Sequence, residues 1–161
     1  MLSTRLTKKS PRGGYELLES RSLAILHGVG TFQEKVLDRL VVHLQAQGFA
    51  GIKRGHIIFL AALDCDANYA ANVARTLNVS RQAVHKNVRE LEAAGWLETC
   101  KNPSLQNQRT IHFSKEGERM MSLARRFFAE LDAELLAVVG DVGLGAIEAL
   151  LRYSFDTLAE E

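Results

Sequence analysis

Apolar residues recur at intervals of three and four over most of the chain, which predicts a mainly helical fold. The first such run extends from Tyr15 to near Gly48. Gly28 and Gly30 interrupt this run, so it predicts either one long helix with a weakened turn or two helices that meet there. The stretch 51–64 predicts a short helix that is buried on more than one side. Its apolar positions are Ile57, Ile58, Leu60 and Leu63.

The middle of the chain predicts two helices joined by a tight turn. The segment ANYAANVARTL, residues 67–77, carries an inner stripe that includes Val73 and Ala74, and Asn78 follows it. Asparagine tolerates the left-handed backbone of such a turn. Ser80 is expected to cap the second helix and Gly95 to end it. The residues expected to hold the second helix in place are Val79, Val84, Val88 and Leu91.

After Gly95 the pattern predicts two short strands, WLETC (96–100) and RTIHF (109–113), separated by turn-forming residues. We expect Trp96 to fill the core beneath this hairpin. Ser114 is expected to begin a long helix that reaches Gly140, and a last helix is expected from about Leu144 to Leu158. The predicted fold class is therefore mainly α with a small β-hairpin wing, a winged helix-turn-helix with long N- and C-terminal dimerisation helices.

The same pattern divides the chain into four parts. Residues 1–14 form a flexible basic arm, 15–50 the N-terminal dimerisation helix or helices, 51–113 the winged helix-turn-helix DNA-binding domain, and 114–161 the C-terminal dimerisation helices. A short basic transit peptide is the alternative for the arm. The terminal helices carry more apolar residues than a monomer of this plan could cover, which predicts a homodimer. An intramolecular bundle with the N-terminal helix is the alternative.

Charge is distributed unevenly along the 161 residues, although the net charge is only +1. Lys and Arg outnumber Asp and Glu by 9 to 6 in residues 1–66 and by 7 to 4 in residues 67–117, whereas residues 118–161 hold 4 basic and 9 acidic residues. Two basic segments therefore precede an acidic tail, which suits one face that meets an anion. The sequence shows neither a membrane-spanning run nor a signal peptide, so we expect a cytoplasmic protein with no membrane partner.

The second helix of the predicted pair carries the candidate chemistry. Its free side has no acid in the first turns, and its Arg, Lys and Gln side chains can bond to guanine or adenine edges. The residues expected to read bases are Arg81, Gln82, His85 and Lys86. The residues expected to hold phosphate or the minor groove are Ser80, Arg89, Lys101 and Arg109. An ordinary solvated helix face is the alternative, and the preceding helix, turn and hairpin argue against it.

Other kinds of site find little support in the sequence. Cys65 and Cys100 form no CxxC motif, and Cys65 lies between two aspartates that disfavour a thiolate, so Cys100 beside Lys101 is the better candidate for a redox sensor. The histidines lack the spacing of a metal site. With no nucleophile elbow or phosphate-cradling glycine loop, we expect neither an enzyme nor a cofactor.

The stretch VARTLNVSRQAVHKNVRELEAAGWLE, followed by a hairpin and FSKEGERM, resembles the winged-helix core of MarR-type transcriptional regulators. Part of it, SRQAVHKNVRELE, also resembles the DNA-binding module of biotin repressors, and the flanking helices favour the MarR type. The resemblance implies a homodimeric regulator, a repressor, that binds a pseudo-palindromic operator in double-stranded DNA. It also implies release by a small-molecule effector, such as a phenolic ligand, or by oxidation.

The sequence departs from this family at two places. The family's wing usually carries an Asp-Arg-Arg tip, whereas this chain offers either Leu105, Gln106 and Asn107 or, after a shift of two, Asn107, Gln108 and Arg109. Lys101 is therefore a second candidate for the minor-groove contact. Asn87 stands where the family usually has an apolar residue, which indicates a polar seam or an outward tilt. The competing hypothesis for the whole chain is a winged-helix module that binds a protein rather than DNA.

Overall fold

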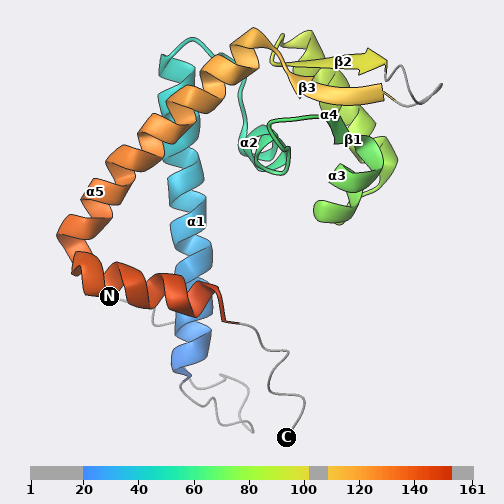
Figure 1. Cartoon of the computed structure of the whole chain (residues 1–161). Coiled ribbons are helices and arrows are strands. Elements are labelled where there is room, and N and C mark those ends of the chain that lie inside the picture. Colours follow the sequence, from blue (N-terminus) through green and yellow to red (C-terminus); the bar gives the residue numbers. More distant parts are fainter. Residues whose placement is uncertain (1–19, 102–108, 154–161) are drawn as a thin grey trace, which may run out of the picture.

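The structure is a computed structural model that describes residues 20–101 and 109–153 (Figure 1). It confirms the predicted fold class, because helices dominate and a small antiparallel sheet joins them. The elements in chain order are α1 (Arg21–Ala46), α2 (Arg54–Ala61), β1 (Asn68–Tyr69), α3 (Ala70–Thr76), α4 (Arg81–Ala93), β2 (Leu97–Lys101), β3 (Arg109–Phe113) and α5 (Lys115–Leu151). The predicted basic arm, most of the wing tip and the end of the predicted last helix, with Phe155 and Leu158, lie outside the described residues.

Helix α1 is a single continuous helix. The Ser20 hydroxyl caps it by accepting a hydrogen bond from the Leu23 amide at 3.2 Å. Gly28 and Gly30 lie within the helix and do not break it, which decides between the two sequence-based alternatives. Only the half of α1 near its C-terminal end buries large side chains, Leu40 and Leu44.

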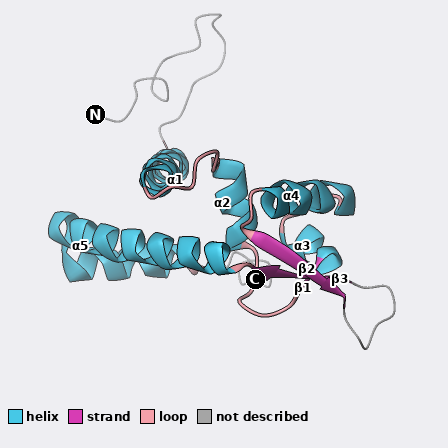
Figure 2. Cartoon of the chain, turned by 90° about the horizontal axis from the view of Figure 1, so that it is seen from above, coloured by secondary structure: helices cyan, strands magenta, loops and turns pink. Residues whose placement is uncertain are grey.

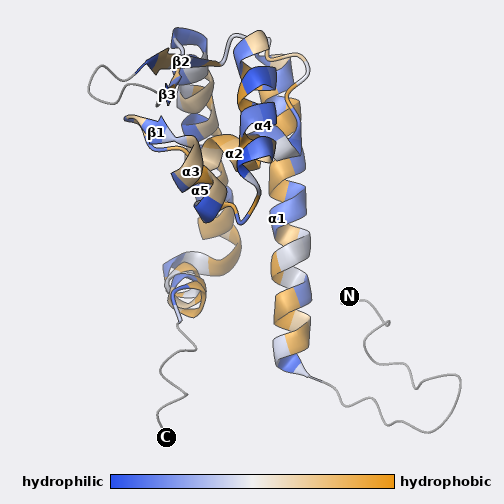
Figure 3. Cartoon of the chain, turned by 90° about the vertical axis from the view of Figure 1, so that its right-hand side faces the viewer, coloured by the Kyte–Doolittle hydropathy of each residue, from blue (hydrophilic) through white to orange (hydrophobic). Residues whose placement is uncertain are grey.

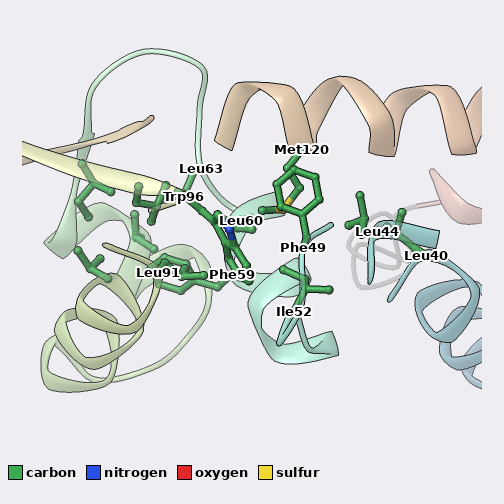
Figure 4. Packing of buried hydrophobic residues seen from close by; sticks show 14 of the residues in the cluster. Leu40, Leu44, Phe49, Ile52, Phe59, Leu60, Leu63, Leu91, Trp96 and Met120 are labelled. Atoms are coloured by element: carbon green, nitrogen blue, oxygen red, sulfur yellow. The ribbon is translucent and has the colours of Figure 1, made fainter. Parts of the chain in front are cut away.

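The core lies around α2, where α1, α4 and the start of α5 meet (Figure 4). Figure 4 shows Phe49, Ile52, Phe59, Leu60 and Met120 gathered at this point. The expectation that Ile58 would be buried is wrong, since 46% of it is exposed. A two-turn helix has one strongly buried side, and Phe59 and Leu60 occupy it.

The sheet has the order β1-β3-β2, with both strand pairs antiparallel. The prediction placed Asn68 and Tyr69 in a helix, but they form the short strand β1, in which Asn68 pairs with Ile111 and Tyr69 with Thr110. The buried Asn68 side chain explains the difference. It accepts from the Asp64 amide and donates to the Asp64 carbonyl, both at 2.8 Å, and so fixes the preceding turn.

Helix α5 begins at a tight junction with the hairpin. The Ser114 hydroxyl accepts from the Gly117 amide at 3.1 Å and donates to the Gly95 carbonyl at 2.6 Å. At Gly140 the backbone is not helical (φ 69°, ψ 170°), and the helix bends sharply there (Figure 1). The second arm begins directly after Gly140 rather than near Leu144, and α5 ends at Leu151.

An ion pair joins α1 to α5. Both terminal guanidinium nitrogens of Arg39, Nη1 and Nη2, donate to the Glu134 carboxylate, at 2.8 and 2.7 Å. This hydrogen bonding lowers the pKa of Glu134 and raises the pKa of Arg39. Seen from above, α1 and α5 lie on one side of the molecule, and α3, α4 and the sheet lie on the other (Figure 2).

Both long helices extend beyond the core, and hydrophobic residues recur along them (Figure 3). Many of these residues have exposed side chains. On α1 these are Leu23, Ile25, Leu26, Val29 and Phe32, and on α5 they include Leu136, Val138, Val139, Val142, Ile147, Leu150 and Leu151. Within the described part of the chain, no helix has the length and hydropathy needed to cross a membrane. One hydrophobic core includes residues of α1, α2, α4 and α5 alike. The predicted domain boundaries stay a prediction.

Candidate nucleic-acid interface

The turn between α3 and α4 has the geometry of a helix-turn-helix. Asn78 adopts the left-handed backbone that its type predicted, with φ of 51°. The expectation that the Val79 side chain would help to lock α4 onto α3 is wrong, because 43% of Val79 is exposed. Its backbone makes the connection instead, since the Val79 amide donates to the Ala74 carbonyl at 3.0 Å.

Helix α4 has one buried side and one free side, as its sequence pattern predicted. Val84, Val88 and Leu91 are 0%, 4% and 0% exposed. The Ser80 hydroxyl caps the helix by accepting from the Ala83 amide at 3.1 Å, and the first turn holds no acid. All the candidate DNA-contacting residues of this helix and its cap are exposed: Ser80, Arg81, Gln82, His85, Lys86 and Arg89.

Asn87 lies between these two sides and is half-buried. Its side-chain amide donates to the Ala83 carbonyl one turn earlier, at 3.0 Å. The polar group is therefore bonded within its own helix, and no tilt of α4 is needed to expose it.

Several side chains on the free face of α4 have polar neighbours. The Lys86 ammonium lies 3.9 Å from the Glu90 carboxylate, and the Arg89 Nε donates to the His85 carbonyl at 3.3 Å. Glu90 also faces His56 of α2, whose Nε2 lies 3.6 Å away. The ring of His56 in turn packs edge-on against Trp96, which is buried under the wing as expected.

The structure brings residues of α4 and the wing together around a hollow of about 380 Å³. His85 and Arg89 line it from α4, and Arg109 lines it from β3. Lys101 is the direct cross-strand partner of Arg109. Three cationic candidates and His85 thus surround or adjoin one groove between the helix and the hairpin. The other candidates for the wing tip, residues 105–108, lie outside the described residues.

Sequence reasoning missed a residue pair that positions this groove. The Thr99 hydroxyl of β2 donates to the Glu92 carboxylate of α4 at 2.7 Å, and both residues line the hollow. This bond ties the wing to the helix. No motif links the two positions in the sequence, since Glu92 and Thr99 meet only after the chain reverses at Gly95.

Comparison with known proteins identifies the fold but gives no close relative. No family model matches the sequence, and no curated protein matches it. Among solved structures, apo MarR from E. coli aligns with a TM-score of 0.64 at 18% identity, over 86% of this chain and 97% of that one. A MepR mutant from S. aureus aligns with a TM-score of 0.66 at 15% identity, over 87% and 99%.

A third structure is of a mutant MarR from E. coli complexed with operator DNA. It aligns with a TM-score of 0.62 at 18% identity, over 80% of this chain and 89% of that one. The chain thus forms a winged helix-turn-helix with long terminal helices. More particularly, it has the fold of the MarR-type regulators, as the resemblance in sequence implied.

Proposed function

We propose that this protein is a sequence-specific DNA-binding transcriptional regulator rather than an enzyme. The observation that carries the proposal is the free face of α4. Buried valines and a leucine hold the opposite side, and the exposed side presents cationic and amide groups with no acid in the first turn. A helix held this way can enter the major groove and bond to base edges.

The proposed contacts divide into two kinds. Arg81, Gln82, His85 and Lys86 read bases from the exposed face of α4. Ser80, Arg89, Lys101 and Arg109 hold phosphate or the minor groove, and the helix–wing hollow supports this assignment because Arg89 and Arg109 both line it. A MarR of the same fold has been crystallised with operator DNA, which further supports DNA as the partner.

The regulator is proposed to act as a homodimer on a pseudo-palindromic operator. The apolar side chains exposed on α1 and on the second arm of α5 support this assembly, because a monomer would leave them in water. A two-fold axis would present two α4 helices to half-sites about 34 to 36 Å apart. Repression, and release by a small-molecule effector, are also proposed, and both rest on the family resemblance.

Selection of bound sequences from a random DNA pool tests the proposal. Enrichment of a palindrome is the expected result, and enrichment of no sequence would contradict specific recognition. A salt titration of the selected site then distinguishes the competing protein-interaction module. Phosphate contacts require log Kd to rise steeply with log salt concentration, whereas flat dependence would favour a protein partner.

A further inference from the structure

Glu90 of α4 lies between two basic side chains that belong to different elements. Its Oε1 lies 3.9 Å from the Lys86 Nζ, one turn earlier on α4, and its Oε2 lies 3.6 Å from the Nε2 of His56 on α2. The Lys86 side chain is 75% exposed, whereas the His56 side chain is 13% exposed. One carboxylate therefore connects a proposed base contact to a histidine that packs against the core.

The ring of His56 depends on Glu90 for any charge that it carries. Its Nδ1 is buried and has no hydrogen-bond partner among the described residues, and the ring packs against Trp96 with centroids 6.0 Å apart. A neutral ring that donates toward Glu90 holds its proton on Nε2, so the proton that charges the ring enters at Nδ1. Because no described residue accepts that proton, the charge of Glu90 must stabilise the imidazolium.

Charged groups on the other elements around α2 bind elsewhere. Arg54 of α2 donates to Asp38 of α1 through two nitrogens. At the start of α5, Arg119 donates to Glu116. Among the described residues, Glu90 is the carboxylate that lies within ion-pair distance of His56.

The free protein divides the charge of Glu90 between Lys86 and His56. When Lys86 turns to a base edge, a positive charge leaves the neighbourhood of Glu90, and the carboxylate then acts on His56 alone. A histidine changes its charge between about pH 5 and 8. The departure of Lys86 therefore favours the uptake of a proton from solvent at His56.

We propose that Glu90 is a positioning residue that holds Lys86 in the free protein and exchanges it for a protonated His56 when DNA binds. This proposal rests on the proposed function, because Lys86 must contact DNA. One proton moves from solvent to the Nδ1 of His56, and no other bond forms or breaks. Since the complex holds more protons than the free protein, affinity for DNA rises as pH falls through the range in which histidine titrates.

NMR spectroscopy of the free protein tests the coupling without DNA. The His56 ring signal is assigned by its loss in His56→Gln, and its imidazole carbon shifts report the protonated fraction at pH 7. Lys86→Gln imitates the departure of Lys86 and should raise this fraction, whereas Glu90→Gln should lower it. Glu148→Gln is the matched control and should leave it unchanged, because Glu148 also pairs with an arginine one turn away but lies on α5.

The pH dependence of DNA affinity tests the exchange itself. The affinity for the selected site is measured at pH 6 and pH 8 in a His85→Asn background, because His85 lies on the proposed DNA face and could take up a proton of its own. His56→Gln and Glu90→Gln should each lower the ratio of the two affinities by up to about fivefold. Glu90 is exposed, so Glu90→Gln keeps the test valid where His56→Gln does not fold.

Two outcomes would overturn the proposal. The first is an unchanged protonated fraction of His56 in Lys86→Gln, and the second is an unchanged affinity ratio in Glu90→Gln. A parent chain that binds no DNA would instead overturn the proposed function, and the NMR response would still show whether Glu90 couples Lys86 to His56. The two failures are therefore distinguishable.

Discussion

Lys101 and Arg109 face each other directly across the hairpin, at the end of β2 and the start of β3. Like charges at directly opposite positions destabilise a strand pair. Both side chains are exposed, and Arg109 also lines the hollow beside α4. A phosphate near both would offset their repulsion, so the proposed DNA contact offers a physical reason for this unfavourable pair.

Arg81→Ala and Lys86→Ala test the proposed base contacts. Each is expected to weaken binding to the selected site by about 1 to 3 kcal/mol and to relax specificity at one base pair, since bidentate contacts to a base edge are lost. Gel-shift titration against the selected site and against single-base variants of it measures both effects.

Arg109→Ala should instead weaken binding to all sequences alike and reduce the salt slope by about 1.

Arg152→Ala is the control for these variants, because Arg152 lies at the end of α5 and pairs with Glu148. A double Arg81→Ala, Lys86→Ala variant that binds the selected site at full affinity would refute the base-reading assignment.

Gly117 lies where the start of α5 meets the hairpin, and no larger residue fits there. A Cβ at this position would lie 2.0 Å from the Trp96 carbonyl oxygen. Because the obstacle is backbone, Gly117→Ala is expected to lower the free energy of unfolding by more than about 2 kcal/mol in urea denaturation. Gly145→Ala in the same helix is the control. A Cβ there meets nothing within 4 Å, so this variant should be neutral or stabilising.

The sequence predicted the structural roles of individual residues where those roles depend on local backbone chemistry. Ser80 and Ser114 cap helices and Asn78 takes the left-handed turn as expected, because each role depends on a few neighbouring residues. Burial of single side chains was less predictable. Ile58 and Val79 are apolar and expected inside, yet tertiary packing leaves both exposed.

Among the elements, the pair α1 and α5 is joined by the Arg39–Glu134 ion pair, which predicts a specific pH dependence. Hydrogen bonding to Arg39 lowers the folded-state pKa of Glu134, so the pair stabilises the fold above the unfolded-state pKa of about 4.3. That contribution is lost as pH falls through the lowered folded-state pKa. Glu134→Gln should therefore lower the urea midpoint at pH 7, and the difference from the parent protein should disappear at strongly acidic pH.

Glu148→Gln is the matched control for this prediction, because Glu148 forms an ion pair with Arg152 one turn away on the same helix. Both pairs are exposed, but Arg39 donates two hydrogen bonds to Glu134 and joins two helices. Arg152 donates one to Glu148 within one turn, so the loss of this second pair should change the midpoint less. A Glu134→Gln difference that stays constant down to acidic pH would show that the carboxylate does not act through its charge.

At the scale of elements, the helices, their order and the hairpin follow from periodicity and capping residues. The strand β1 does not, because two residues in a strand leave no periodic pattern and their pairing with β3 joins positions more than forty residues apart. A helix end was expected at Gly140, and α5 bends there instead. The end of α5 at Leu151 was not expected, since the apolar pattern of the sequence continues beyond it. Likewise, the contact of Glu92 with Thr99 depends on tertiary structure.

In the molecule as a whole, the exposed basic residues and the exposed apolar residues lie mostly on different elements. The basic groups proposed for DNA lie on α4 and the wing, and most of the exposed large apolar side chains lie on α1 and α5. Mostly separate elements carry these two surfaces, and one hydrophobic core joins the elements. A second copy could therefore cover the apolar surface and leave α4 free, which is the geometry that a dimeric regulator requires.

This arrangement predicts that the apolar arm of α5 carries the dimer contact. Val142 is 88% exposed, so an aspartate there would be tolerated in a monomer but would place a charge in the proposed dimer interface. Val142→Asp is expected to shift the protein from dimer to monomer in analytical ultracentrifugation at micromolar concentration. Because dimerisation stabilises the folded state by mass action, the Tm of the parent protein should also rise with concentration, and that of the variant should not.

Val79→Asp provides the control, since Val79 is the same residue type and is also exposed, at 43%, but lies in the turn before α4. It should leave the sedimentation coefficient unchanged and, if the proposed interface with DNA is right, weaken DNA binding by placing an acid beside the phosphates. The two variants thus separate assembly from recognition. If the parent chain sediments as a monomer at all concentrations, the exposed apolar side chains must have another partner, and binding of a two-fold symmetric operator would lose its structural basis.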